Sequence, residues 1–480
     1  MRRLARRPCR LYGPAVGRVG IYRFAKCSGE SVMTHTAARV ERVFWVACPV
    51  ILFVVMFGHM TAIVFNALAL MALGVLAAAC SPNRPSLLHW PLVLPIAGWA
   101  GWSLASVAWS VYPMVSLHAW CDEVLYPLVS FWGFWLFGTQ LRRPAPVVFV
   151  NWLACLALAA ISALNWGHLQ PPTANTFPLH FYNRVGHTST LAVFAMPLFA
   201  GFMLRSRWRV IGASGIALCL FIGLATLNRF FWPAAAVTLL VALFPLYRRR
   251  LLLAMLVITV VFAASVGTLE FSSRLRTAGA VPAVPLARDI AIEGHQVYVP
   301  GSLSAIGDTV SADTRPKLWA FYIGEAERHA WVGVGFGKPL PGLVYRSEMP
   351  ASLLALEPYA LTHAHNLFIN TWLQTGVIGV VLQTALLLSL VVRFYRLRRV
   401  DPWLCSAGVA LVAGMIVKNT TDDFMWQTTM LAFWAFAGLQ LGCAEQVEAS
   451  DGMLPDTGRR KSTLAPGEQR RKVPTAKLGE

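Results

Sequence analysis

The run NLFINTWLQTGVIGVVLQTALLLSLVV, residues 366–392, contains no Asp, Glu, Lys or Arg. As a helix, this run would rise roughly 40 Å, which exceeds the hydrocarbon core of about 30 Å in a typical bilayer. Four arginines follow it directly, namely Arg393, Arg396, Arg398 and Arg399. Positive charge beside an apolar run is typical of the cytoplasmic end of a transmembrane helix. The stretch therefore predicts a membrane-spanning helix whose carboxyl end lies in the cytoplasm.

The composition of the whole chain excludes a soluble globular protein. Of its 480 residues, 56% are hydrophobic and only 13% are charged, whereas soluble domains carry about 25% charged residues. The net charge of +19 does not indicate nucleic-acid binding, because most Lys and Arg lie in short stretches between apolar runs. The nine cysteines lie in the tails, in apolar runs or at their edges, so we expect no disulfide framework.

Eleven further apolar runs bring the candidate spans to twelve. The spans are 43–60, 62–80, 91–109, 121–138, 146–165, 187–204, 209–226, 230–246, 251–268, 366–392, 403–418 and 424–443. With the amino terminus in the cytoplasm, the short loops on the opposite side hold only Arg184, Arg229 and Lys418, and the cytoplasmic loops hold the arginine clusters. We predict an all-α polytopic membrane bundle of about 12 transmembrane helices, with both termini in the cytoplasm.

The remaining segments divide the chain further. We expect a basic cytoplasmic tail (1–42), nine helices (43–268), a large periplasmic loop (269–365), three helices (366–445) and a disordered cytoplasmic tail (446–480). Met33 is a candidate translation start, which would make residues 1–32 an artefact of the start site.

The periplasmic loop contains one clear helical pattern. Asp313 and Thr314 precede Pro316, an arrangement that favours a helix start. An apolar stripe at helical spacing follows, made of Leu318, Trp319, Tyr322, Ile323 and Ala326. The stripe predicts a helix that lies at the membrane interface or against the bundle. A small packed subdomain without chemistry explains the pattern equally well.

Four ionisable residues lie near span ends on the periplasmic side: Arg184, Arg229, Arg315 and His365. Guanidinium groups bind phosphate oxygens in a bidentate manner, and a neutral histidine can take a proton from a hydroxyl. Together they suit a lipid-phosphate donor and a hydroxyl acceptor. Taken singly, an arginine at a span end is more often a headgroup anchor.

Three further patterns favour a structural interpretation over a functional one. His363 and His365 do not share a face on a helix, so we do not expect a metal site. The glycines at 333, 335 and 337 precede Lys338-Pro339 rather than the Lys-Ser/Thr of a phosphate loop, which favours a flexible turn. Asp422 and Asp423, with Lys418, favour pairing at the interface over an ion path.

The order of these motifs resembles the core signature of the O-antigen ligase and polymerase superfamily. The signature is an Arg leading an aromatic-bearing helix, a Gly-rich turn, His-Asn and a span with two glycines, which here are Arg315, 332–337, His365-Asn366, and Gly376 with Gly379. Two upstream segments, Asn183-Arg184 and Arg229 with Trp232, are similar to further family segments. The second departs from the commoner Ser-Arg-Gly, since residues 228–230 read Asn-Arg-Phe. The resemblance covers about residues 187–445.

The resemblance implies a metal-independent glycosyltransferase of the bacterial inner membrane that needs no cofactor. Its partners would be a glycan donor linked to undecaprenyl diphosphate, lipid A–core or another hydroxyl acceptor, and membrane lipids. By the same analogy, Arg229 and Arg315 would bind the diphosphate and stabilise the leaving charge, and His365 would be the general base. The remaining candidates would help to bind substrate: Arg184, Asn366, Trp319 and Lys317.

Three acceptors remain open under this resemblance. Transfer to lipid A–core would make the enzyme an O-antigen ligase, which the single long loop favours. Transfer to another repeat unit would make it a polysaccharide polymerase, and transfer to Ser or Thr would make it a protein O-oligosaccharyltransferase. A polysaccharide transporter is a different class, disfavoured because we detect no internal repeat and because the candidate charges cluster at one surface.

Overall fold

The structure is a computed structural model of the 480-residue chain. It describes residues 47–54, 56–57, 61–80, 86–141, 145–164, 185–203, 208–226, 228, 230–277, 287–292, 295–300, 315–356, 363–421 and 423–452. The tails at 1–42 and beyond 452, and the candidate site residues Arg184 and Arg229, lie outside these ranges.

Helices make up most of the described chain. The first group precedes the long loop and comprises α2 (Thr61–Ala79), α3 (Val93–Ala105), α4 (Pro113–Trp120), α5 (Tyr126–Gln140), α6 (Ala145–Leu164), α8 (Val185–Met203), α9 (Arg209–Ala225), α10 (Phe231–Ala242), α11 (Phe244–Tyr247) and α12 (Leu251–Thr277). The loop region holds strands β1 (Ala287–Ile292) and β2 (His295–Pro300), then α14 (Arg315–Arg328), α15 (Leu340–Tyr345) and α16 (Ala351–Leu356). The last group comprises α17 (Leu367–Arg396), α18 (Pro402–Thr420) and α19 (Gln427–Gly452).

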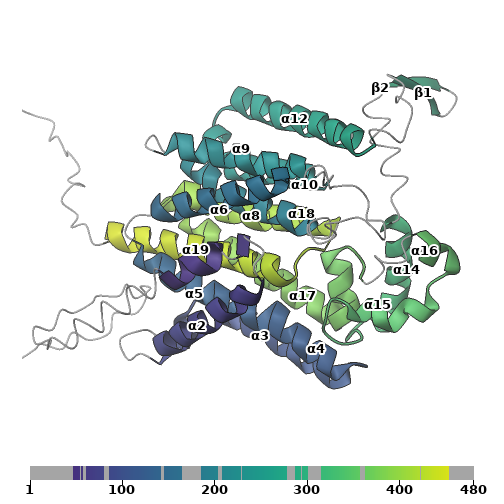
Figure 1. The fold of residues 1–480 in the computed structure, drawn as a ribbon, viewed down its shortest axis with the longest axis horizontal. Helices are drawn as coiled ribbons and strands as arrows, with labels where there is room; N and C mark the ends of the chain where they lie inside the picture. Colours follow the sequence, from purple (N-terminus) through teal and green to yellow (C-terminus); the bar gives the residue numbers. More distant parts are fainter. Residues whose placement is uncertain are drawn as a thin grey trace, which may run out of the picture.

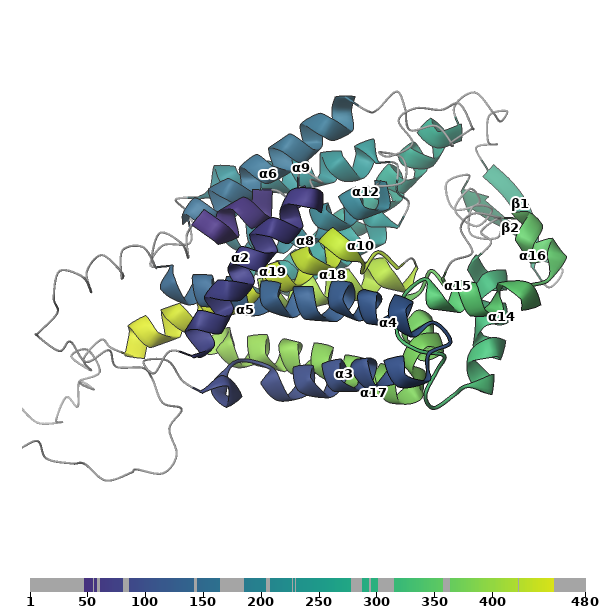
Figure 2. The same cartoon turned by 60° about the horizontal axis from the view of Figure 1, so that its bottom comes forward.

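The long helices lie side by side and form a bundle, with α14, α15 and α16 gathered at one end of it (Figure 1). Turning the view shows α3 running beside α17 (Figure 2). Five described helical stretches are long and apolar enough to cross a membrane: Val147–Leu164, Gly186–Met203, Leu251–Thr268, Leu367–Arg399 and Pro402–Thr420. The predicted helical membrane bundle is therefore confirmed, whereas the number of twelve spans stays a prediction.

Some helices extend beyond the ranges that the apolar runs predicted. α12 continues to Thr277 and α19 to Gly452, past the predicted ends of these spans at 268 and 443. The predicted span 121–138 is part of a longer helical run, in which α4 passes through a π-helical segment, Cys121–Leu125, into α5. The antiparallel hairpin of β1 and β2, which pairs Ala287 with Pro300, was not expected in an all-α chain.

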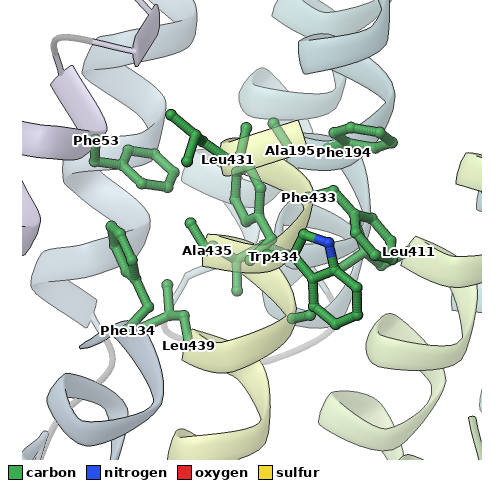
Figure 3. Packing of buried hydrophobic residues seen from close by; sticks show 14 of the residues in the cluster. Phe53, Phe134, Phe194, Ala195, Leu411, Leu431, Phe433, Trp434, Ala435 and Leu439 are labelled. Carbon is green, nitrogen blue, oxygen red and sulfur yellow. The ribbon is translucent and has the colours of Figure 1, made fainter. Parts of the chain in front are cut away.

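The centre of the bundle is built on α19, which packs against α5 and α8. Phe433, Ala435 and Leu439 of α19 are buried among aromatic side chains of several helices (Figure 3). Glycines let α19 approach α5 closely, because a Cβ at Gly438 would lie 2.1 Å from the Phe131 carbonyl oxygen. Small residues at helix contacts are the usual means of close packing in membranes. α18 packs against α19, and α17 in turn packs against α18.

α17 is broken near its beginning, at Gly376, where φ is 69° and ψ is −174°. The segment 330–335 from the loop packs into this break and forms backbone hydrogen bonds with α17. The N–H of Val334 donates to the Leu373 carbonyl at 2.9 Å, and the N–H of Val377 donates to the Ala330 carbonyl at 2.8 Å. The Gly-rich segment is therefore a buried partner of α17, where we expected a flexible turn.

The helix expected after Asp313 and Thr314 is present as α14. Three residues of the predicted stripe are buried, Leu318, Tyr322 and Ala326, whereas Ile323 is exposed. The buried residues pack with α15 and α16 and with Ala364 and Leu373 at the start of α17. The subdomain of α14, α15 and α16 therefore rests on the bundle rather than standing apart from it.

Candidate functional site

The first turn of α17 is fixed by Asn366. Its Oδ1 accepts hydrogen bonds from the N–H groups of Phe368 at 2.9 Å and Ile369 at 3.1 Å, which makes it the N-cap. Its Nδ2 donates to the Thr420 carbonyl at the end of α18, at 2.8 Å. Asn366 therefore has a structural role in both helices, in addition to the substrate-binding role that we predicted.

His365 lies directly before this cap, at a sharp turn of the chain. Its φ of 49° is in the left-handed region, which non-glycine residues rarely adopt and which is often found at functional sites. The turn places the rings of His363 and His365 only 4.2 Å apart between centroids. We expected the two histidines to share no face, because we assigned them to the start of a helix. This expectation is wrong, because both histidines precede the helix and lie in the turn.

Trp319 ties α14 to the histidine turn. Its Nε1–H donates to the carbonyl of Ala364, the residue before His365, at 2.8 Å. Arg315 lies four residues earlier, so both side chains share one face of α14 and lie about 6 Å apart along the helix. The hydrogen bond therefore places the amino-terminal part of α14, which begins at Arg315, beside the turn that carries His365.

Arg315 also contacts the turn between α9 and α10. Its guanidinium carbon lies 4.4 Å from the centroid of the Phe230 ring, within the range of a cation–π interaction. This contact joins the start of α14 to Phe230, the residue before α10, whereas Arg229 lies outside the described residues. Lys317, two residues after Arg315 in the chain, is exposed. Arg184 belongs to the segment before α8 that lies outside the described residues.

The tyrosines of the subdomain are poor candidates for a base. Burial raises the pKa of Tyr345 to about 12 and also raises the pKa of Tyr322. An unperturbed tyrosine, with a pKa of about 10, is already protonated at physiological pH, and the raised values make both phenols weaker acids still. A histidine, with its unperturbed pKa of about 6.5, is the better proton acceptor in this region.

A buried polar cluster beside the first turn of α17 was missed by the sequence reasoning. Lys338 and Asp423 form an ion pair, with 3.5 Å between Nζ and Oδ1, and each is only 4% exposed. The backbone N–H of Lys338 donates to Oε1 of the buried Glu123 at 3.4 Å. Nδ2 of Asn370 donates to the other carboxylate oxygen of Asp423 at 3.2 Å.

This cluster corrects our expectation for Asp423. Asp423 pairs with Lys338 inside the protein, and the Lys418 ammonium, also buried, lies 4.1 Å from the centre of the Phe424 ring. Asp422 lies outside the described residues. The sequence contained one signal for this cluster: Lys338 is the lone lysine in a segment of glycines and apolar residues. A buried lysine needs a carboxylate nearby.

A cavity of about 50 Å³ lies beside the cluster. Its polar lining comes from Glu123, Thr371, Gln374, Gln383 and Asp423, and its remaining lining is apolar. Polar groups converging in an otherwise apolar cavity are typical of binding sites.

Comparison with protein-family models gives a match to the O-antigen ligase family over residues 192–384. The predicted resemblance to this superfamily is thereby confirmed. The matched residues include Arg229, Arg315, Lys338 and His365, but not Arg184. None of the curated proteins compared with the chain matches it.

Proposed function

We propose, on the premise that residues 192–384 resemble the O-antigen ligase family, that this chain is a glycan ligase of the bacterial inner membrane. It transfers a glycan from undecaprenyl diphosphate to a hydroxyl group on the periplasmic face. Lipid A–core is the proposed acceptor. The observation that carries the proposal is the hydrogen bond from Trp319 to Ala364, because it joins the arginine-bearing helix to the histidine turn.

The proposed mechanism uses two kinds of side chain. His365 accepts the proton of the acceptor hydroxyl while its oxygen attacks the anomeric carbon of the donor sugar. The bond from that carbon to the diphosphate breaks, and the released diphosphate takes the electron pair. Arg315, with Arg229, stabilises this developing negative charge. The proton then passes from His365 to solvent, and the site is ready for another cycle.

The acceptor distinguishes this proposal from two others that use the same donor. A polysaccharide polymerase would extend another repeat unit, and a protein O-oligosaccharyltransferase would modify Ser or Thr. The single long loop between the ninth and tenth predicted spans favours the ligase.

Lipopolysaccharide from a deletion strain tests the acceptor. The strain is expected to lose the long-chain ladder on a gel and to accumulate lipid-linked polymer. Wild type should restore the ladder and Arg315→Ala should not, because loss of one charge-stabilising donor lowers turnover by about 10²–10³. Arg328→Ala is the matched control: it lies on the same helix, its guanidinium is exposed, and it pairs with Glu325 at 2.7 Å.

The other outcomes of this gel are equally informative. A core that carries a single repeat unit would indicate the polymerase. An unchanged ladder in the deletion strain would exclude the ligase and point to a protein or another exported glycan as the acceptor. Equal rescue by Arg315→Ala and wild type would remove the role of Arg315.

Trp319→Phe removes the indole N–H and leaves the Ala364 carbonyl without this donor. We expect the transfer rate to fall by about three- to thirty-fold, since the histidine turn loses a contact worth about 1 kcal/mol or somewhat more. Initial rates with purified enzyme in detergent measure the effect. Trp331→Phe is the control, because the Trp331 side chain is exposed. Equal rates for Trp319→Phe and wild type would show that the bond does not support the site.

A further inference from the structure

Lys338 is carried into the protein interior by the segment that fills the break in α17. The N–H of Gly335 donates to the Gln374 carbonyl and the N–H of Gly337 to Gln374 Oε1, both at 2.9 Å. These bonds fix the backbone on the amino-terminal side of Lys338, and the Leu340 N–H donates back to the Gly337 carbonyl at 2.9 Å. Lys338 is therefore held in one place before its side chain makes any contact.

The side chain of Lys338 is surrounded by acceptors and one aromatic ring. Its ammonium donates to the Asp423 backbone carbonyl, pairs with the Asp423 carboxylate at 3.5 Å, and lies 5.7 Å from the Trp426 ring centre. Glu123, which accepts the Lys338 backbone N–H, lies on the π-helical segment Cys121–Leu125. Such π-helical insertions occur frequently at functional sites. Removing either partner of a buried ion pair leaves an uncompensated charge.

Asp423 connects Lys338 to the first turn of α17, because its carboxylate contacts both. The second carboxylate oxygen of Asp423 accepts a hydrogen bond from Asn370. Asn366 donates to the carbonyl of Thr420, the last residue of α18, three residues before Asp423. The first turn of α17 is thus held to residues 420–426 by two side-chain hydrogen bonds. His365 immediately precedes this turn, so its position depends on both.

We infer that Lys338 is a positioning residue of the transfer reaction: its ion pair with Asp423 holds the first turn of α17, and through it His365, in the reactive position. This inference rests on the proposed function, with His365 as the base. Lys338 acts through Asp423 and Asn370 and need not touch the substrate.

Lys338→Met, Asp423→Asn and the double variant test the inference in purified enzyme. We expect each single change to lower kcat ten- to a hundred-fold with the KM for donor changed less than about three-fold, because the arginines that bind the diphosphate are untouched. The double variant should be no slower than the worse single variant, since it removes both partners of the ion pair together. It also gives a folded protein should either single variant fail to insert.

Amide hydrogen exchange of residues 363–370 gives a readout that does not depend on activity. We expect faster exchange in Lys338→Met, because the Asn366 cap loosens when the turn at 420–426 moves. Arg393→Met is the matched control. It too removes an ion pair, the one between Arg393 of α17 and Glu445 of α19 at 2.6 Å. Arg393 lies roughly 40 Å along the helix from His365. It should leave both kcat and the exchange of 363–370 unchanged.

Three results would overturn the inference: an unchanged kcat in Lys338→Met, effects of the single variants that multiply in the double, or a lowered kcat without faster exchange at 363–370. Failure of the proposed function is a separate result. In that case wild type transfers no glycan to any acceptor supplied. The exchange of 363–370 in Lys338→Met, measured against Arg393→Met, then decides alone whether Lys338 holds the turn.

Discussion

His365→Ala is expected to lower kcat for glycan transfer by about 10²–10⁴, the usual contribution of a general base. The KM for donor should change little, because Arg315 and Arg229 remain. Alanine also adopts the left-handed backbone conformation at position 365 less readily than asparagine does. His365→Asn is therefore the better second variant, since it removes the base and tolerates the turn. Initial rates with purified enzyme, lipid-linked donor and acceptor measure both variants.

His363→Ala is the matched control for this experiment. It removes an imidazole from the same turn, with its ring centroid 4.2 Å from that of His365. We expect less than a ten-fold loss. A loss as large as that of His365→Ala would mean that the role of general base has been assigned to the wrong histidine. Activity of a correctly inserted His365→Asn enzyme within ten-fold of wild type would remove the base from the mechanism.

Gly376→Ala is expected to leave little folded protein in the membrane. A φ of 69° with a ψ of −174° is essentially restricted to glycine. A Cβ at this position would also lie 2.0 Å from the carbonyl carbon and oxygen of Trp331, which are backbone atoms and cannot rotate away. Backbone strain alone costs about 1–3 kcal/mol, and the overlap adds to it. The yield of monodisperse protein after extraction, and its thermal unfolding in detergent, measure the loss.

Gly101→Ala provides the comparison within the bundle. Gly101 lies in α3, which packs beside α17, and a Cβ there would meet nothing within 4 Å. Alanine in a helix is more favourable than glycine by about 0.5–1 kcal/mol, so this variant should be at least as stable as wild type. Equal stability of Gly376→Ala and Gly101→Ala would show that α17 is not broken at Gly376.

The sequence was sufficient to predict the helical membrane bundle, because long uncharged runs with flanking arginines are characteristic of transmembrane helices. It also placed a helix after Asp313 and Thr314 and selected Arg315 and His365, whose elements the Trp319 contact joins. These predictions depend on local patterns, each contained within about thirty residues.

Most of the features that were missed depend on contacts between distant segments, and one depends on a local backbone conformation. The pairing of Val334 with Leu373 joins backbones, and backbone groups carry no sequence signal apart from the glycines that permit close approach. The Glu123, Lys338 and Asp423 cluster joins three parts of the chain that no periodicity relates. The rings of His363 and His365 meet because of one left-handed residue, which a helical template does not anticipate.

The pairing of segment 330–335 with α17 has a consequence for biosynthesis. The segment precedes α17 in the chain, so it is synthesised before Leu373 and Gln374, whose carbonyls accept its hydrogen bonds. Its final conformation must therefore wait until α17 has been synthesised and inserted. Residues 315–356 expressed alone lack those partners and should not reach the same conformation. We therefore expect the segment that carries Lys338 to reach its final conformation only after the tenth predicted span has entered the lipid.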